Sequence, residues 1–123
     1  MDKRELVIKN CFNSWIIKDV SAFRDSFDDN AVYIESWGPA YRNKDHIITW
    51  FIDWNKENRV LEWNIKEFFH AKNICICEWY FNCECDGVID GFNGVSVITF
   101  NEENKIVLLK EFQSKSPNNY PYE

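Results

Sequence analysis

The chain has 123 residues, of which 46% are hydrophobic and 17% aromatic, and this suits one globular domain that builds a core without disulfides or metals. Its net charge of -6 and pI near 4.9 disfavour nucleic acid and membrane surfaces as partners, because both attract lysine and arginine. No apolar run approaches the roughly 20 residues that span a bilayer, and the charged N-terminus does not resemble a signal peptide, so we expect a cytoplasmic protein.

The first half of the chain predicts three helices and one short strand. Apolar residues recur with helical spacing over 3–17, over a second short segment that reaches Phe27, and over 44–55. Between the second and third helices, residues 31–35 are predicted as a strand that leads into a turn at Gly38. Helices therefore cluster toward the start of the chain.

The second half alternates apolar and polar residues with period two, which predicts a meander of long strands. The predicted strands are 60–70, 74–85, 91–100 and 105–114. The order α-α-β-α-β-β-β-β predicts an α+β fold, with N-terminal helices packed on one face of a strongly curved antiparallel sheet. One domain is expected over residues 1–115, followed by a polar tail over 116–123.

Five cysteines without a secretion signal indicate free thiols. The spacing of the pairs Cys75/Cys77 and Cys83/Cys85 is similar to that of zinc ligands. However, residues 74–85 are predicted as one continuous strand, which places the two pairs about 26 Å apart. Zinc needs all its ligands within about 2.3 Å of the metal. We therefore expect buried structural cysteines and no metal.

The order of elements and several short stretches resemble SnoaL-like members of the nuclear transport factor 2-like superfamily. The matching stretches are Phe27–Val32, Glu35–Gly38, Tyr41–Ile47, Gly94–Phe100 and Lys105–Val107. The resemblance covers nearly the whole chain. It implies a cone, in which a strongly bent sheet wraps helices around an internal pocket, and it implies dimers that form through the sheet.

Within this superfamily, the segment from Phe27 to Gly38 aligns without gaps on the ketosteroid isomerase pattern. Glu35 then falls on the carboxylate general base. The positions of the two oxyanion donors fall on Cys11 and Ser96, where a thiol is a weak donor and serine is shorter than aspartate. The resemblance thus implies a base without the oxyanion pair. The alternative for Glu35 is a surface residue, or one paired with Arg42.

Glu111 and Gln113 share one face of the last predicted strand with Leu109, and in the resembling fold that face lines the cavity. A charge on an apolar inner face is costly unless it is paired or used. The alternative is a bulge that turns Glu111 to solvent.

Aromatic residues are expected in two places. Trp15, Trp63 and Trp79 lie at core spacing and are assigned to the core. A second group is expected to form an apolar slot for a planar or cyclic ligand near the pocket mouth. These residues are Trp37, Tyr41, Trp50, Trp54 and Phe92, with Ser96 and Gln113 as polar neighbours.

Two functions remain open. The first is a SnoaL-like domain that binds a small apolar or cyclic molecule. The second is a small lyase, isomerase or cyclase that uses Glu35 as general base and Glu111 as its partner. His46 and His70 have no nucleophile at a motif-like spacing, and no glycine-rich phosphate loop follows a strand, so no cofactor is expected.

The outer face of the predicted sheet is also apolar. Its residues are Ile76, Tyr80, Val95, Val97, Leu108 and Phe112. An exposed patch of this kind on a monomer marks an interaction surface, so we expect a two-fold homodimer through this face.

Overall fold

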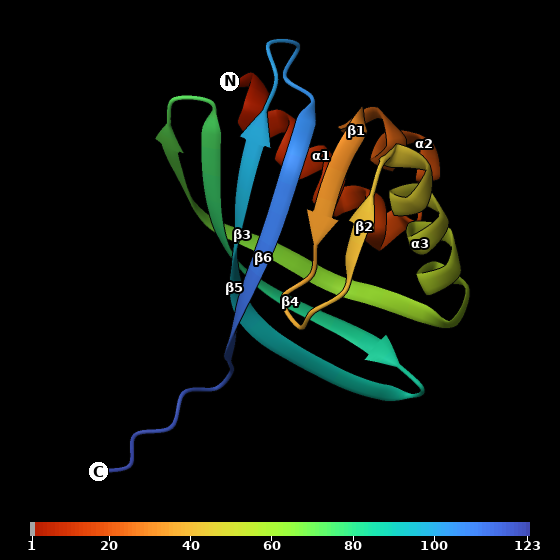
Figure 1. Cartoon of the computed structure of the whole chain (residues 1–123). Coiled ribbons are helices and arrows are strands. Elements are labelled where there is room, and N and C mark those ends of the chain that lie inside the picture. The colour runs from red at the N-terminus through yellow and green to blue at the C-terminus, as the bar shows by residue number, and fades with distance from the viewer. Residues whose placement is uncertain (1) are drawn as a thin grey trace.

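Three helices pack inside the curl of one six-stranded sheet in a computed structural model that describes residues 2–123 (Figure 1). The elements are α1 (Lys3–Ile17), α2 (Val20–Asp25), β1 (Phe27–Ile34), β2 (Ala40–Arg42), α3 (Lys44–Glu57), β3 (Asn58–Ala71), β4 (Ile74–Cys85), β5 (Val88–Phe100) and β6 (Ile106–Lys115). This arrangement confirms the predicted α+β fold class.

Each helix begins at a polar side chain that accepts hydrogen bonds from free backbone N–H groups. Asp2 caps α1, Asp19 caps α2 and Asn43 caps α3. α1 ends at Lys18, which adopts the left-handed conformation with φ of 57° and donates its N–H to Ser14 O. These caps set the residues at which the helices begin and at which α1 ends.

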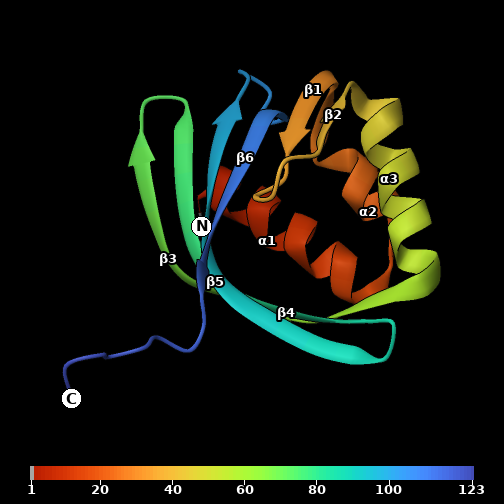
Figure 2. The ribbon, with the colours of Figure 1, turned by 60° about the horizontal axis from the view of Figure 1, so that its bottom comes forward.

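The strands follow the order β2-β1-β6-β5-β4-β3. β1 and β6 pair in parallel, and all other neighbours are antiparallel, so the expected purely antiparallel sheet is wrong at this one junction. The register of β3 on β4 shifts between Val60 and Glu62 and again between Ile65 and Glu67. Such bulges bend a strand, and Figure 2 shows β3, β4 and β5 curving beneath the helices.

The strands β3 and β6 differ from the predicted ones by one or two residues at their ends, and three other differences are larger. Phe27 begins β1 rather than ending α2, because it pairs with Ile106 of β6. The three-residue strand β2 was not predicted, since so short a segment shows no periodicity. β5 begins at Val88 rather than at residue 91.

The core lies between α1, α2, α3 and the inner face of the sheet. Its largest fully buried side chains include Trp79, Tyr33, Phe12 and Phe23. Beyond Lys115, residues 116–123 form no helix or strand and are mostly exposed, and Figure 1 shows this tail leaving the sheet. Among residues 2–123, no helix is long and apolar enough to cross a membrane.

Candidate functional site

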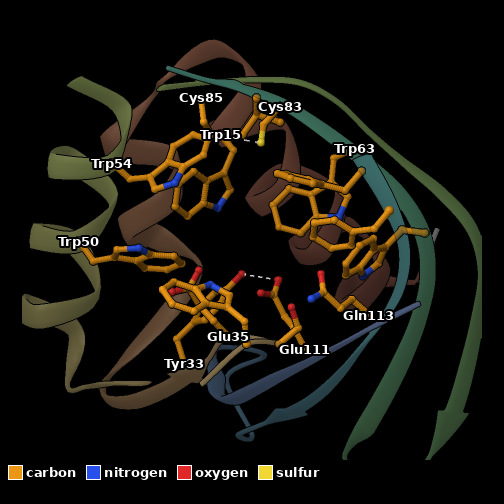
Figure 3. A pocket seen from close by; sticks show the side chains of 16 residues that line it. Trp15, Tyr33, Glu35, Trp50, Trp54, Trp63, Cys83, Cys85, Glu111 and Gln113 are labelled. Carbon is orange, nitrogen blue, oxygen red and sulfur yellow. Dashed lines mark hydrogen bonds between the residues drawn. The ribbon is translucent and has the colours of Figure 1, made fainter. Parts of the chain in front are cut away.

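A cavity of about 180 Å³ opens between the helices and the curled sheet (Figure 3). Aromatic rings form most of its wall, and two glutamates supply its acidic groups. The lining residues are Trp15, Tyr33, Glu35, Ser36, Trp37, Trp50, Trp54, Val60, Trp63, Trp79, Phe81, Cys83, Cys85, Phe92, Glu111 and Gln113. We call this space the tryptophan cavity, because all six tryptophans of the chain line it.

Glu111 reaches the tryptophan cavity from β6. The register of β5 on β6 is unbroken from Phe92 to Thr99, so alternation along β6 keeps Glu111 and Gln113 on the inner face. The phenol of Tyr33 on β1 donates a hydrogen bond of 2.7 Å to Glu111 Oε2. The parallel pairing of Tyr33 with Leu109 brings the phenol and the carboxyl group together.

Glu35 follows directly after β1, at the start of the turn that leads into β2. Its backbone N–H donates to Pro39 O at 2.9 Å, which holds the turn. The phenol of Tyr41 on β2 donates a 2.7 Å hydrogen bond to Glu35 Oε2. Its partner is therefore Tyr41, while Arg42 lies exposed on the strand.

The pKa of both carboxyl groups lies above the ordinary value of a glutamate. Burial raises the pKa of Glu111 to about 8, the Tyr33 hydrogen bond opposes that rise, and the charge of Glu35 adds to it. The side chain of Glu111 keeps some accessible surface, and this surface faces the cavity. Its carboxyl group is enclosed by protein, and this enclosure raises its pKa. Burial also raises the pKa of Glu35, against hydrogen bonds from Tyr41 and Trp37. At neutral pH the raised pKa of Glu111 therefore favours its protonated form.

The aromatic wall is held rigid by ring contacts. Trp15 lies at its centre, with ring centroids 4.9 Å from Trp50 and 5.5 Å from Trp54. Trp50 stacks on Tyr41 at 4.3 Å, and Trp63 stacks on Phe12 at 4.0 Å. Both stacked tryptophans also contact Trp15, and part of each side chain lines the cavity.

Two indole N–H groups in this wall are buried without a partner. They belong to Trp15 and Trp63, whose side chains are 3% and 8% exposed. A buried N–H without an acceptor costs about 1–3 kcal/mol. Both nitrogens have almost no accessible surface, so an acceptor oxygen would reach them only if neighbouring side chains shift.

The structure brings most of the residues expected in the site to the cavity. Glu35, Glu111, Trp37, Trp50, Trp54, Phe92 and Gln113 all line it. Tyr41 lies behind this lining, where it holds Glu35 and stacks on Trp50. Ser96 is elsewhere: it is fully buried, and its hydroxyl accepts a 2.9 Å hydrogen bond from Trp79 Nε1, so it offers nothing to a ligand.

Sequence reasoning missed Tyr33 and assigned Trp15, Trp63 and Trp79 only to the core. These tryptophans are buried, as expected, but each also lines the cavity. For Tyr33, strand alternation is a usable signal, because Tyr33 and Glu35 are two residues apart and share a face. For the core tryptophans the sequence offers no such signal. A side chain that fills the core and one that lines a cavity recur with the same spacing along a helix or strand.

The cysteines separate into two groups. Cys11, Cys75 and Cys77 are buried, as expected, and burial raises the pKa of Cys11 and of Cys77 to about 12. Cys83 and Cys85 are only partly buried, which corrects the expectation that all five would be interior. Their sulfur atoms lie 3.4 Å apart as free thiols on the cavity wall.

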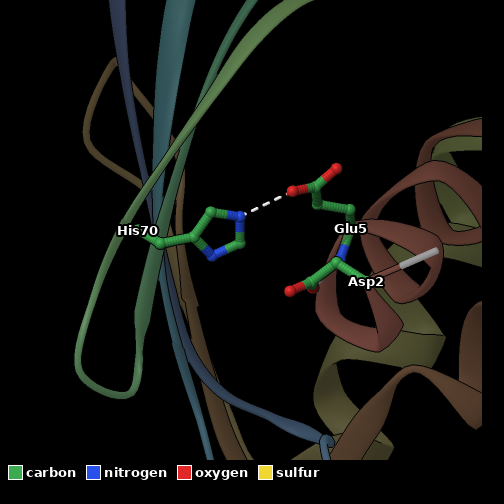
Figure 4. A group of neighbouring side chains, drawn as sticks. All are labelled: Asp2, Glu5 and His70. Carbon is green, nitrogen blue, oxygen red and sulfur yellow. Dashed lines mark hydrogen bonds and ion pairs between the residues drawn. The ribbon is translucent and has the colours of Figure 1, made fainter.

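One group of residues outside the cavity has the composition of a metal site. Ligand atoms of Asp2, Glu5 and His70 all lie within 4.8 Å of one another (Figure 4). Each already has a structural partner: Asp2 accepts from backbone N–H groups at the start of α1, and His70 Nε2 lies 2.6 Å from Glu5 Oε2. A helix cap and an ion pair account for this group.

Comparison with known proteins gives a consistent result for the fold. No protein-family model matches the sequence, and no curated protein matches it significantly. Among solved structures, an LEH-like epoxide hydrolase from M. tuberculosis is similar with a TM-score of 0.81 at 13% identity, over 90% of this chain and 82% of that one. A candidate SnoaL-like polyketide cyclase from Shewanella denitrificans has a TM-score of 0.79 at 12% identity, over 93% and 92%.

A third similar structure is a protein with a ketosteroid isomerase-like fold from Catenulispora acidiphila, in complex with trimethylamine. Its TM-score is 0.78 at 13% identity, over 89% of this chain and 86% of that one. The chain thus has the cone-shaped fold of the SnoaL-like and nuclear transport factor 2-like proteins. Proteins of this fold differ in function, so the function must be argued from the cavity.

Proposed function

We propose that this chain binds a small, largely apolar or cyclic molecule that carries an oxygen acceptor, in the tryptophan cavity. The observation that supports this most is the combination of an aromatic wall with a neutral carboxyl group, Glu111, at its end. Ligand sites are mostly apolar and hold a few polar groups that orient the ligand. Here the Glu111 carboxyl group and the Gln113 amide are donors for such an oxygen.

The size of the cavity favours a compact ligand. Its volume of about 180 Å³ holds a molecule of one or two rings. Trp37, which is 70% exposed, lies at the outer end of the lining, where a ligand enters.

A second candidate function is proton transfer, as in a small lyase, isomerase or cyclase. The observation that favours it is that two glutamates line one cavity and that burial raises the pKa of one of them, Glu111, to about 8. The Glu35 carboxylate would take a proton from a carbon next to a ligand carbonyl, and the Glu111 carboxyl group would donate a hydrogen bond to the carbonyl oxygen that gains charge. The neutral acid and its phenol partner, Tyr33, would then serve as the oxyanion donor that the sequence positions Cys11 and Ser96 do not supply.

Binding is tested by calorimetric titration with small cyclic ketones, of which cyclohexenone is the first. We expect saturable binding to the wild-type chain and its loss in Cys83→Phe, which fills the cavity. Cys83→Ser is the matched control, because it keeps the space open and should bind as the wild type does. Equal binding by Cys83→Phe would contradict the proposal, and so would the failure of every small molecule tested, ketone or other, to bind the wild type.

Proton transfer is tested by exchange of the ketone's α-protons for deuterium, followed by NMR. The wild type should accelerate exchange, and Glu35→Gln should reduce the rate by a factor of about 100 or more, which is the usual contribution of a general base. Unchanged exchange in Glu35→Gln would leave binding as the only function of the cavity.

A further inference from the structure

We infer that the preferred ligand of the tryptophan cavity is an organic cation, a quaternary ammonium or protonated amine. This rests on the proposed function, since it assigns a ligand class to the same cavity. The inference is based on the composition of the cavity lining. Among the described residues, six tryptophans and two glutamates line the cavity, and no basic residue does.

The first line of support is the composition of the wall. Trp15, Trp37, Trp50, Trp54, Trp63 and Trp79 are all of the tryptophans in the chain, and all of them line this one space. An indole face attracts a cation more strongly than the rings of Tyr or Phe do, when the cation lies within about 6 Å of the ring centroid. Cages of such rings are the usual binding sites of quaternary ammonium groups.

The second line of support is charge. The lining includes two carboxyl groups, those of Glu35 and Glu111. Across residues 2–123, it includes no lysine, arginine or histidine. A cation that enters meets Glu35 and Glu111 with nothing to repel it. The chain as a whole carries a net charge of -6, which draws cations toward the protein and repels anions.

The third line of support is rigidity. Trp50 and Trp63 are each fixed by a stacked neighbour, Tyr41 and Phe12 respectively, with interplanar angles of 12° and 7°. A cage that is already formed loses little freedom when a compact ligand enters. A trimethylammonium group is rigid and nearly spherical, so it suits a wall of flat rings that meet edge to face.

The pH dependence of binding separates a cationic ligand from a neutral one. A cation prefers ionised carboxylates, so its affinity rises with pH as Glu111 loses its proton near pH 8. A neutral ligand that accepts a hydrogen bond from the Glu111 carboxyl group shows the opposite trend. The other titratable groups that line or face the cavity are Cys11, Tyr33, Tyr41, Cys83 and Cys85.

Most of these thiols and phenols do not ionise in the range of interest. Burial raises the pKa of Cys11 and of Cys83 to about 12, and it raises the pKa of Tyr33 and Tyr41 above their usual 10. Cys85→Ser provides a control for the remaining thiol. Between about pH 6 and pH 8, the two glutamates therefore govern the charge of the cavity.

The test compares choline with dimethylbutanol, its uncharged isostere, in which a tert-butyl group replaces the trimethylammonium group. Affinity is measured by calorimetry in phosphate buffer at about pH 6 and pH 8. We expect choline to bind at least tenfold more tightly than its isostere and more tightly at the higher pH. In Glu111→Gln this gain with pH should disappear, whereas Cys85→Ser should retain it.

Biosynthetic replacement of tryptophan by mono-, di- and trifluorotryptophan completes the test. Fluorine withdraws electron density from the indole face with little change in shape, and every replaced side chain lines the cavity. Choline affinity should fall stepwise with fluorination, and dimethylbutanol affinity should not.

If dimethylbutanol or cyclohexenone binds as tightly as choline or more tightly, the cation inference is wrong and the proposed binding function stands. If neither choline nor any neutral molecule binds, the cation inference and the proposed binding function are both wrong.

Discussion

The phenol of Tyr33 donates a 2.7 Å hydrogen bond to Glu111 Oε2 across the parallel junction of β1 and β6. Within residues 2–123, this pair joins the only two neighbouring strands that run in the same direction. It places a carboxyl group with a raised pKa at the end of an aromatic cavity, where it can act on a ligand. The predictions below concern this pair, the cavity wall and the outer sheet face.

The first prediction concerns stability and pH. The pKa of Glu111 is about 8 in the fold and near its ordinary value of 4.5 in the unfolded chain, so the folded state retains a proton that the unfolded state loses. The free energy of unfolding should therefore fall as pH rises from about 4.5 to about 8, and then level off. We expect this contribution to be roughly 5 kcal/mol, because each pH unit between 4.5 and about 8 is worth about 1.4 kcal/mol.

The measurement is urea denaturation of the wild type and Glu111→Gln at pH values across this range. Glu111→Gln should lack the decline and should gain stability over the wild type as pH rises. The exposed Glu102→Gln is the control and should follow the wild type. Parallel profiles for the wild type and Glu111→Gln would show that Glu111 is ionised at neutral pH.

The second prediction concerns the phenol. The Tyr33 hydrogen bond lowers the pKa of Glu111, so Tyr33→Phe should raise that pKa further above 8. A carbon-13 NMR titration of the glutamate carboxyl signals measures this directly. Tyr41→Phe is the matched control, because Tyr41 bonds to Glu35 and its removal should raise the pKa of Glu35 instead. A Glu111 pKa that falls or stays unchanged in Tyr33→Phe would contradict the pairing.

The third prediction concerns Gly94, which is opposite Trp79 in the β4–β5 ladder. A Cβ at residue 94 would fall on the Trp79 ring and 2.6 Å from Phe112 O, so no side chain fits there. We expect Gly94→Ala to destabilise the fold by about 1–3 kcal/mol and to move Trp79 into the cavity.

Adding Trp79→Phe should recover part of that loss, because the smaller ring leaves room for the methyl group. Chemical denaturation of the two single variants and the double variant measures this coupling. Fully additive losses would mean that the contact with Trp79 does not limit residue 94.

The fourth prediction concerns the outer sheet face. Val97 lies beside Ile76 of β4, and Val95 lies beside Phe112 of β6, which is 56% exposed. We propose that a second copy of the chain covers this face in a two-fold dimer, because an exposed apolar patch of this kind marks an interface. Light scattering at micromolar concentration should give the dimer mass, and Val97→Asp should give the monomer mass. A monomeric wild type would contradict this.

Much of the fold follows from the sequence because its signals are local. Helical spacing of apolar residues identifies α1 and α3, and period-two alternation identifies the long strands. The parallel pairing of Phe27 with Ile106 could not be predicted in this way, since it depends on contacts between residues far apart in the chain.

The candidate site, like the fold, was predicted from the sequence only in part. Glu35, Glu111 and Gln113 follow from alternation and from the family resemblance, and the structure brings them to one cavity. The roles of Tyr33 and Trp15 depend on how the sheet curls around α1, and no local pattern encodes that curvature. The partial exposure of Cys83 and Cys85 has the same origin, because they lie where the wall of the cone opens.

The most direct test of the central claim, that the tryptophan cavity is a ligand site, uses the six indole N–H signals in a nitrogen–proton NMR spectrum. Every one of them reports on the cavity wall, because no tryptophan lies elsewhere in the chain. During titration with cyclohexenone or choline, we predict saturable shifts of several indole signals. Backbone amides of the outer face, such as that of Val97, should stay in place. If a molecule binds the chain and leaves all six indole signals unmoved, the cavity is not its site and the account is wrong.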